Sequence, residues 1–216
     1  MIEKIIRRDF MPATLKDSAI NTLAIMEEFK ISEIPVVDEN NKFLGLIEED
    51  SILNMENLQA SLMEMRKKLK NIFLFSNAHF FQCIQTLTEN NLSIIPVLDS
   101  KKLYFGYISP SDVIGKIGEL NYDNSFIITI SVNKKDFMIH EISRLIEENN
   151  GKIMAFFSEM KKEKIYIHFL INCNNNQLIT QTLSRYDYEV IDTLSAEIQR
   201  NELDDRFESF IKYLNT

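Results

Sequence analysis

One stretch of this chain occurs twice, and the repeat constrains the fold more than any other feature of the sequence. The segment EIPVVDENNKFLGLIEEDS covers residues 33–51, and IIPVLDSKKLYFGYISPSD covers residues 94–112. A shift of 61 residues aligns the two segments without a gap. The matches fall where backbone geometry is demanding, at Pro35/Pro96, Asp38/Asp99 and Gly45/Gly106. The sequence therefore builds one structural unit twice.

Each copy predicts the same order of elements. Residues 17–30 and 77–91 place apolar side chains at every third or fourth position, which indicates a helix before each repeat. A strand opened by a proline, a polar turn, a second strand and a short helix follow. Lys30 and Asn91 stand at the two helix exits, where asparagine tolerates a left-handed conformation better than lysine does.

The segment between the copies, residues 53–70, also has helical spacing. Its apolar side chains recur three to four residues apart, at Met55, Leu58, Leu62, Met65 and Leu69. This spacing predicts a linker helix whose methionine-rich stripe packs in the core or in a dimer interface rather than around a ligand. The first unit is then expected at residues 1–70 and the second at 71–120.

The pattern changes at about residue 124. Residues 124–194 read as a strand, a helix, two strands around a charged turn, a second helix and a last strand. This βαββαβ order is the ferredoxin-like arrangement. Residues 195–216 predict a C-terminal amphipathic helix with Leu203, Phe207, Phe210, Ile211 and Leu214 on one face. The fold class expected for the whole chain is α+β.

Composition excludes several classes of function. The net charge of −8 opposes a general nucleic-acid role, because phosphate binding needs a basic face. The two cysteines and three histidines share no metal-ligand spacing, so no metal is expected. Phosphate-binding and nucleophile motifs are lacking, which argues against an enzyme. No apolar run is long enough to span a bilayer, and no secretory signal is recognisable, so the expected compartment is the cytoplasm.

The repeat carries a family resemblance. Two copies of Ile-Pro-Val-hydrophobic-Asp, a turn, and hydrophobic-Gly-hydrophobic-Ile resemble a tandem pair of CBS (cystathionine-β-synthase-type) domains, each a β-α-β-β-α unit in a pseudo-symmetric body. Residues 124–194 resemble an ACT domain, and the combination is similar to acetoin-utilisation-type regulatory proteins. The resemblance implies a regulatory module that binds an adenine nucleotide (AMP, ADP, ATP or a relative such as S-adenosylmethionine) in a cleft between the paired units.

The resemblance also implies particular site residues. In the family a Ser/Thr-x-x-Asp follows the second strand, and here Ser109 and Asp112 fit that pattern, with the carboxylate accepting hydrogen bonds from the ribose hydroxyls. The adenine is expected against Ile94, Ile95 and Pro96. The same Ser-Pro-x-Asp sequence is also a good helix start, so capping and binding remain compatible interpretations.

The first copy departs from this pattern. Glu48 and Ser51 occupy the positions of Ser109 and Asp112, which brings negative charge where a phosphate would lie. We therefore expect a nucleotide site beside the second copy, while the first copy is empty or holds a different ligand. Seven basic residues near the unit boundaries are candidates to meet the phosphates: Arg7, Arg8, Lys67, Lys68, Lys70, Lys101 and Lys102.

The ACT-like segment departs from its family as well. Lys135 and Asp136 stand at the corner between the first strand and the first helix, where amino-acid-binding ACT domains usually have a glycine. Dimerisation through the sheet of this domain is therefore favoured over amino-acid sensing, and His168 is interpreted as a packed histidine. Two functions remain: a non-enzymatic nucleotide sensor working as a homodimer on an unknown regulated protein, or an assembly module that has lost its ligand.

Overall fold

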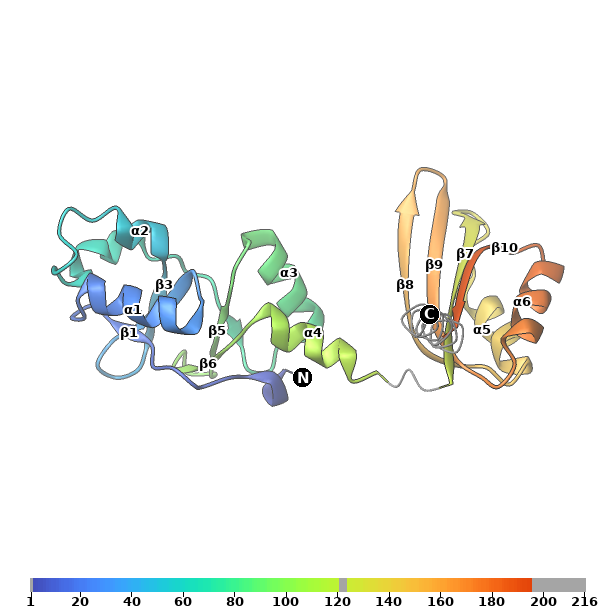
Figure 1. Ribbon diagram of the computed structural model, residues 1–216, viewed down its shortest axis with the longest axis horizontal. Coiled ribbons are helices and arrows are strands. Elements are labelled where there is room, and N and C mark those ends of the chain that lie inside the picture. The colour runs from blue at the N-terminus through green and yellow to red at the C-terminus, as the bar shows by residue number, and fades with distance from the viewer. Residues whose placement is uncertain (1, 121–123, 196–216) are drawn as a thin grey trace, which may run out of the picture. The chain divides into compact units, whose positions relative to one another are not determined.

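The chain folds into two compact units, one of residues 1–118 and one of residues 119–216. A computed structural model describes residues 2–120 and 124–195, and Figure 1 shows the elements of each unit. The boundary between the two units lies where the sequence pattern changes from the repeat to the βαββαβ order. We describe each unit separately, and call the repeats in the N-terminal unit the first repeat and the second repeat.

The two repeats contain the same elements in the same order. The first repeat consists of β1 (Ala13–Thr14), α1 (Ala19–Phe29), β2 (Glu33–Val37), β3 (Phe43–Glu48) and α2 (Glu49–Leu53). The second repeat consists of β4 (Leu74–Phe75), α3 (Phe80–Asn90), β5 (Ile95–Leu98), β6 (Tyr104–Ile108) and α4 (Pro110–Gly118). Each forms a three-stranded sheet, in the orders β1-β2-β3 and β4-β5-β6, with a parallel and then an antiparallel pair. The β-α-β-β-α prediction is confirmed.

Local chemistry sets the ends of the helices. The Ser18 hydroxyl caps α1, and His79 and Gln82 form a capping box at the start of α3. Lys30 and Asn91 end the two helices in the left-handed conformation, with φ of 53° and 50°. The lysine adopts this conformation although it is less suited to it, because the repeat needs the same sharp exit in both copies.

Two glycines of the N-terminal unit allow other chain segments to cross its sheets at close range. Gly45 and Gly106 have φ of +156° and +154° and occupy equivalent positions in β3 and β6. A Cβ atom on Gly106 would lie 2.4 Å from the backbone oxygen of Arg7, and one on Gly45 would lie 2.6 Å from Cβ of Leu69. A side chain at either position would push away a segment that crosses the sheet. The repeat therefore needs glycine twice.

The cores of the two repeats interlock. Ile94 and Tyr107, from the second repeat, are buried in the core of the first. Phe43 and Leu46, from the first repeat, are buried in the core of the second. Ile2 also belongs to this second core, so the N-terminal segment packs on the second repeat although it was grouped with residues 1–70. The two repeats therefore share their hydrophobic cores and form one compact unit rather than two independent domains.

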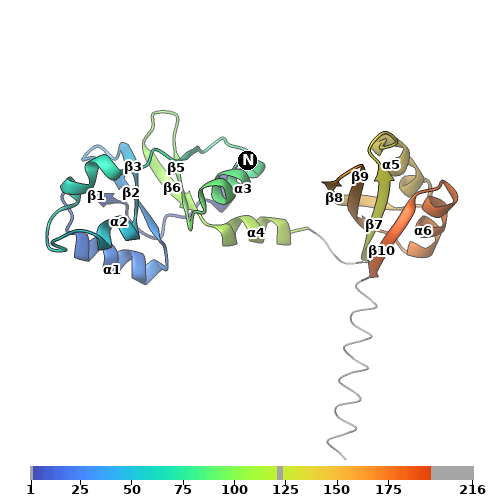
Figure 2. The same cartoon turned by 90° about the horizontal axis from the view of Figure 1, so that it is seen from above.

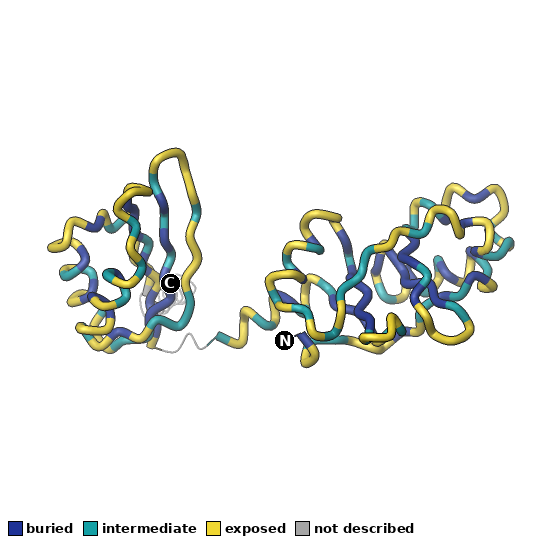
Figure 3. The backbone as a smooth tube through the Cα atoms, turned by 180° about the vertical axis from the view of Figure 1, so that it is seen from behind, coloured by how far each residue is buried: buried dark blue, intermediate teal, exposed yellow. Residues whose placement is uncertain are grey.

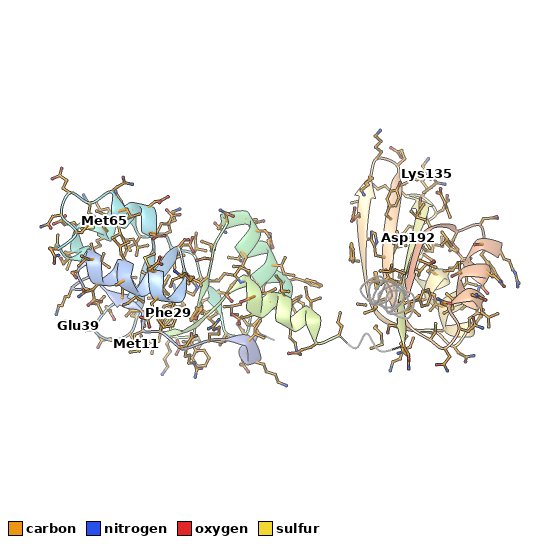
Figure 4. The ribbon with its side chains drawn as sticks, viewed as in Figure 1. Met11, Phe29, Glu39, Met65, Lys135 and Asp192 are labelled. Carbon is orange, nitrogen blue, oxygen red and sulfur yellow. The ribbon has the colours of Figure 1, made fainter. Side chains whose placement is uncertain are left out.

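The predicted linker helix over residues 53–70 is wrong. α2 ends at Leu53, and only a 3₁₀ helix, η2, follows at Leu62–Lys68. The intervening backbone bonds to α1 instead: Ala19 N–H donates to Ala60 O at 3.0 Å, and Ile20 N–H donates to Leu58 O at 2.9 Å. Tertiary contacts thus outweigh helical spacing. The core role of the stripe is nevertheless confirmed, because Met55, Leu62 and Met65 are buried (Figure 4 labels Met65).

The C-terminal unit has the ferredoxin-like topology that the sequence predicts. Its elements are β7 (Ser125–Asn133), α5 (Ile139–Glu148), β8 (Lys152–Lys161), β9 (Lys164–Asn172), α6 (Asn176–Arg185) and β10 (Glu189–Ser195). The antiparallel sheet has the order β10-β7-β9-β8, and both helices lie on one side of it (Figure 2). The core forms between this face and the helices. The predicted helix of residues 196–216 lies outside the described residues.

Candidate functional site

Ser109 and Asp112 lie at the beginning of α4 and bond to each other. The backbone N–H of Ser109 donates to Oδ2 of Asp112 at 2.8 Å, and the Ser109 hydroxyl donates to the same oxygen at 2.5 Å. In return, Asp112 N–H donates to Ser109 Oγ at 3.4 Å. The capping interpretation is therefore confirmed. Both bonds from Ser109 reach Oδ2, so a ribose would use Oδ1 or compete with the Ser109 hydroxyl.

A basic residue from the N-terminal segment lies beside this helix start. Arg7 pairs with Tyr107 through backbone bonds of 2.8 Å and 3.0 Å, which fixes the segment across β6. Its guanidinium forms an ion pair with Asp9. The hydrogen bond that Arg7 donates to Asp9 is the main cause of a raised Arg7 pKa, and the charge of Asp112 raises this pKa further. Arg7 therefore lies within electrostatic reach of the Asp112 carboxylate.

Asp9 and Tyr107 complete this group. The Tyr107 hydroxyl donates to Asp9 Oδ1 at 2.5 Å. Burial acts to raise the pKa of Asp9, but the bonds from Tyr107 and Arg7 outweigh it and lower that pKa below its ordinary value. Burial, and then the bond to Asp9, raise the pKa of Tyr107. The tyrosine stays neutral and the carboxylate stays charged near neutral pH.

Two further aromatic rings, Phe10 and Phe29, continue from Tyr107, and sequence reasoning missed all three rings. The ring of Phe10 lies 4.5 Å from that of Tyr107 and 5.3 Å from that of Phe29. Phe29 is half-buried and lies at the C-terminal end of α1 (Figure 4). Tyr107 aligns with Leu46 in the repeat, and this aromatic-for-aliphatic difference was the available signal. Phe10 and Tyr107 are buried, so of these three rings only the half-buried Phe29 presents aromatic surface.

The residues expected to hold the adenine are all buried. Ile94 and Ile95 have no exposed surface, and they belong to different cores, Ile94 to the first and Ile95 to the second. Pro96 is buried within β5 and faces Tyr107 in the register. Their side chains offer no surface on which a base could stack. In this conformation only main-chain groups of this strand could read an adenine edge.

The other candidate cations divide between the repeats. The Arg8 guanidinium lies over the ring of Phe105, 3.8 Å from its centroid, and donates to the Phe105 carbonyl. Lys70 pairs with Glu48, beside α2 of the first repeat. Lys67 and Lys68 end η2, and Lys101 and Lys102 lie in the exposed turn between β5 and β6. Of the seven candidates, Arg7 is the one whose pKa is raised by the charge of Asp112.

The first repeat borders a cavity of about 490 Å³ at the start of α2. Its lining residues come from both repeats: Ser32, Glu33, Glu48, Glu49, Asp50, Asn90, Asn91, Leu92 and Ser93. Glu33 is only 5% exposed and accepts bonds at Oε2 from the N–H and the hydroxyl of Ser93, at 2.9 Å and 2.5 Å. Four carboxylates around this space, with Lys70 paired to one of them, oppose a phosphate.

The repeat relates this cavity to the corresponding region of the second repeat. The shift of 61 residues replaces Glu48, Glu49 and Asp50 with Ser109, Pro110 and Ser111. It also replaces the buried Glu33 with Ile94, and it pairs Asn91, at the exit of α3, with Lys30, at the exit of α1. We call the cavity around the start of α2 the first cleft and, by its equivalent position in the repeat alone, the region around the start of α4 the second cleft. The second cleft has lost every one of those four carboxylates.

The corner of the C-terminal unit is polar. A cavity of about 390 Å³ lies between the end of β7 and the start of β10, and Asp136 lines it. Asn133 donates to Asp136 at 3.1 Å, and the Tyr188 hydroxyl donates to Glu141 at 3.0 Å. The prediction that Lys135 and Asp136 crowd an amino-acid ligand stays a prediction. Lys135 itself is exposed (Figure 4).

His168 is packed, as the sequence predicted. Its ring stacks on Phe157 with centroids 4.3 Å apart, and Nδ1 lies 3.0 Å from the Thr129 hydroxyl. Within residues 2–120 and 124–195, no cluster of three or more His, Cys, Asp or Glu side chains could hold a metal ion. Over the same ranges, none of the helices has the length and apolar character needed to cross a membrane.

The repeat matches a known family. The model of the CBS domain matches residues 2–56 and 61–119, more than half of the chain. The chain belongs to the CBS-domain family. The match begins at residue 2, in agreement with the packing of Ile2 in the second core of this CBS pair. The CBS part of the expected resemblance is thereby confirmed, and the C-terminal unit has the topology expected of an ACT-type domain.

Several solved structures are similar to this CBS-domain protein. A CBS domain pair/ACT domain protein from Thermotoga maritima is 19% identical, with a TM-score of 0.49 over 55% of this chain and 96% of its own. The CBS domains of a transcriptional regulator from Streptococcus pneumoniae are 16% identical, with a TM-score of 0.47 over 53% and 96%. CBSX2 in complex with AMP is 15% identical, with a TM-score of 0.45 over 55% and 96%.

Two curated relatives have enzyme names. A homoserine O-acetyltransferase from Methanococcus vannielii is 28% identical over 54% of this chain, and an RNA 2',3'-cyclic phosphodiesterase from Methanocaldococcus jannaschii is 31% identical over 38%. The chain spans about a quarter of the length of the first and about half of the second. Both names describe those whole proteins.

Proposed function

We propose that this protein is a non-enzymatic regulator that binds one adenine nucleotide, of the AMP, ADP or ATP class, in the second cleft. The observation that carries the proposal is that Arg7, held across β6 by its backbone bonds to Tyr107, lies within electrostatic reach of the Asp112 carboxylate. A fixed carboxylate and a nearby guanidinium are the two charges that a ribose phosphate needs. CBS pairs are regulatory modules, and an adenine nucleotide has the ribose and phosphate groups that these two side chains would bind.

Each group in the second cleft has a distinct role in the proposal. Asp112 accepts the ribose hydroxyls, and its bonds with Ser109 hold it in place. Arg7 meets the phosphate after exchanging its contact with Asp9, and the N-terminal N–H groups of α4 assist it. Phe29 offers a half-buried ring for the base, while the buried Ile94, Ile95 and Pro96 shape the strand behind it.

The first cleft does not take a phosphate ligand in this proposal. A nucleotide there would face Glu33, Glu48 and Asp50 at short range, and like charges in a partly buried space disfavour binding. One binding site per chain is the result.

A homodimer is the assembly in which we propose that the regulator works. Pseudo-equivalent helix positions are apolar and exposed in both repeats: Ile20 and Phe81 at 42% and 69%, and Leu53 and Ile114 at 54% and 67%. Exposed apolar side chains repeated by the pseudo-symmetry favour a self-complementary interface between copies. These same positions also support the alternative function, an assembly module that binds a partner protein without a nucleotide.

Calorimetric titration with AMP, ADP and ATP tests the proposal. The variants are Asp112→Asn, which leaves Ser109 an acceptor, and Ser51→Ala, at the equivalent position of the first repeat. We expect one site per wild-type chain, an affinity about a hundredfold lower for Asp112→Asn, and no change for Ser51→Ala. An unchanged affinity in Asp112→Asn would place the ligand elsewhere. A wild-type chain that binds none of the three nucleotides would leave the assembly module as the better account.

A further inference from the structure

One face of the C-terminal sheet is not covered by its helices. The helices α5 and α6 pack on the face that contains Ile128 and Phe169. On the opposite face, one row of cross-strand neighbours is apolar across all four strands. In strand order the row consists of Leu194, Ile127, Leu170 and Ala155. Phe157 extends it on β8, and we call these five residues the open-face patch.

The open-face patch lies at one end of the sheet, and most of it is exposed, although Leu170 in its middle is only 8% exposed. Leu194 is 41% exposed, Ile127 36% and Phe157 59%. Figure 3 shows β8 exposed along much of its length, whereas β9 beside it is mostly buried. Phe157 lies in the next row, whose other members, Asp192, Thr129 and His168, are polar, so the face becomes polar away from the patch. The apolar end is the end at which β10 leaves the sheet, after Leu194.

The sequence that follows β10 matches this patch in length and character. Residues 196–216 place Leu203, Phe207, Phe210, Ile211 and Leu214 at helical spacing. As a helix, residues 203–214 would extend about 16 Å. The patch crosses three inter-strand spacings, about 14 Å. The residues between Leu194 and Leu203 can span up to about 26 Å, so the chain can return to the face that it has just left.

We propose that the chain's own C-terminal segment, residues 196–216, docks across the open-face patch. Two observations favour this occupant over a second copy. The segment is tethered directly at Leu194, which gives it an effective concentration on the order of millimolar. The patch is also small: its few side chains are far from the roughly 800 Å² per partner of a stable interface between proteins.

Two adjacent phenylalanines of β8 provide a matched pair of variants for the full-length protein. Phe157 belongs to the open-face patch, whereas Phe156 points to the opposite face, with its ring 5.6 Å from that of the core residue Phe169. Their exposed fractions are similar, 59% and 50%. Hydrogen exchange measured over residues 203–214 reports docking, because an isolated helix of this length is marginal in water.

We expect protected amides over residues 203–214 in the wild type, exchanging about tenfold faster in Phe157→Ser and unchanged in Phe156→Ser. In the segment itself, Phe207→Ser should cause the same loss, and Asp205→Ser should not. Protection should be the same at two protein concentrations about a hundredfold apart. A wild type without protection would overturn the proposal, as would protection that Phe157→Ser leaves intact. Protection that requires high concentration would assign the patch to a second copy instead. None of these results bears on nucleotide binding, which is proposed for the N-terminal unit.

Discussion

The first and second clefts occupy equivalent places in the two repeats, and their side chains differ in charge. Four carboxylates surround the start of α2, and one of them, Glu33, is almost fully buried. The residues equivalent to those four at the second cleft are Ser109, Pro110, Ser111 and Ile94. Duplication has kept the backbone, including the two close-approach glycines, while the charges have diverged. Equal folds therefore need not mean equal ligands.

The comparison also shows how each cleft obtains its basic residue. Lys70 crosses β3 through backbone bonds with Leu46, and Arg7 crosses β6 through backbone bonds with Tyr107. Lys70 is held by Glu48, within the first cleft itself. Arg7 is held by Asp9, a residue of its own segment, so a ligand can replace this partner without leaving a carboxylate unpaired in the cleft. The two cations have equivalent positions, but in this interpretation only Arg7 can exchange its carboxylate partner for a ligand.

The largest effect is expected from moving the buried carboxylate to the second repeat. Ile94 is fully buried among apolar side chains, and Ile94→Glu should destabilise the N-terminal unit by about 4 kcal/mol. The reverse change, Glu33→Ile, removes the acceptor for two Ser93 donors and should cost about 2 kcal/mol. Urea denaturation gives both values. Equal costs would mean that the clefts tolerate charge alike, contrary to the comparison.

A smaller effect is expected from removing the two crossing cations. Arg7→Ala should weaken nucleotide binding about tenfold, and the loss should grow from AMP to ATP, because each added phosphate adds charge. Lys70→Ala, its equivalent in the first repeat, should leave binding unchanged. Arg8→Ala is a further control, since Arg8 is occupied by Phe105. Titration calorimetry of the three variants measures these affinities. Weaker nucleotide binding in Lys70→Ala would contradict the assignment of the nucleotide to the second cleft.

The smallest effect is expected from acid. The pKa of Asp9 is lowered below its ordinary value of 3.8, so its charged form stabilises the folded state above that pH. This contribution is lost as pH falls through the lowered value. The difference in melting temperature between wild type and Asp9→Asn should be constant from about pH 7 to pH 5 and should shrink towards zero below pH 3.8. Because Asp9 is 40% exposed, the difference should be modest. A difference that persists in strong acid would show that charge is not its cause.

Much of the fold could be predicted because local and long-range signals agree. Local residue preference and tertiary packing favour the same structure in three places: the two Ile-Pro-Val strands, the glycines of β3 and β6, and the alternating residues of β7. The prediction of a helix over residues 53–70 failed because the backbone of this segment accepts hydrogen bonds from the start of α1. The spacing of apolar residues does not reveal these bonds.

The duplicated β-α-β-β-α body of the N-terminal unit and the ferredoxin-like order of the C-terminal unit could be read from the amino-acid sequence, because periodicity and turn residues are local properties. The sequence also singled out Ser109 and Asp112, whose mutual bonds span a single helical turn. Which side chains lie near Ser109 and Asp112 depends on tertiary packing and could not be predicted from the sequence. Arg7 and Phe10 reach the second cleft because the N-terminal segment packs on the second repeat, and Phe29 joins them from α1. The carboxylates of the first cleft likewise converge from separate segments, since packing rather than sequence proximity sets the field in a cleft.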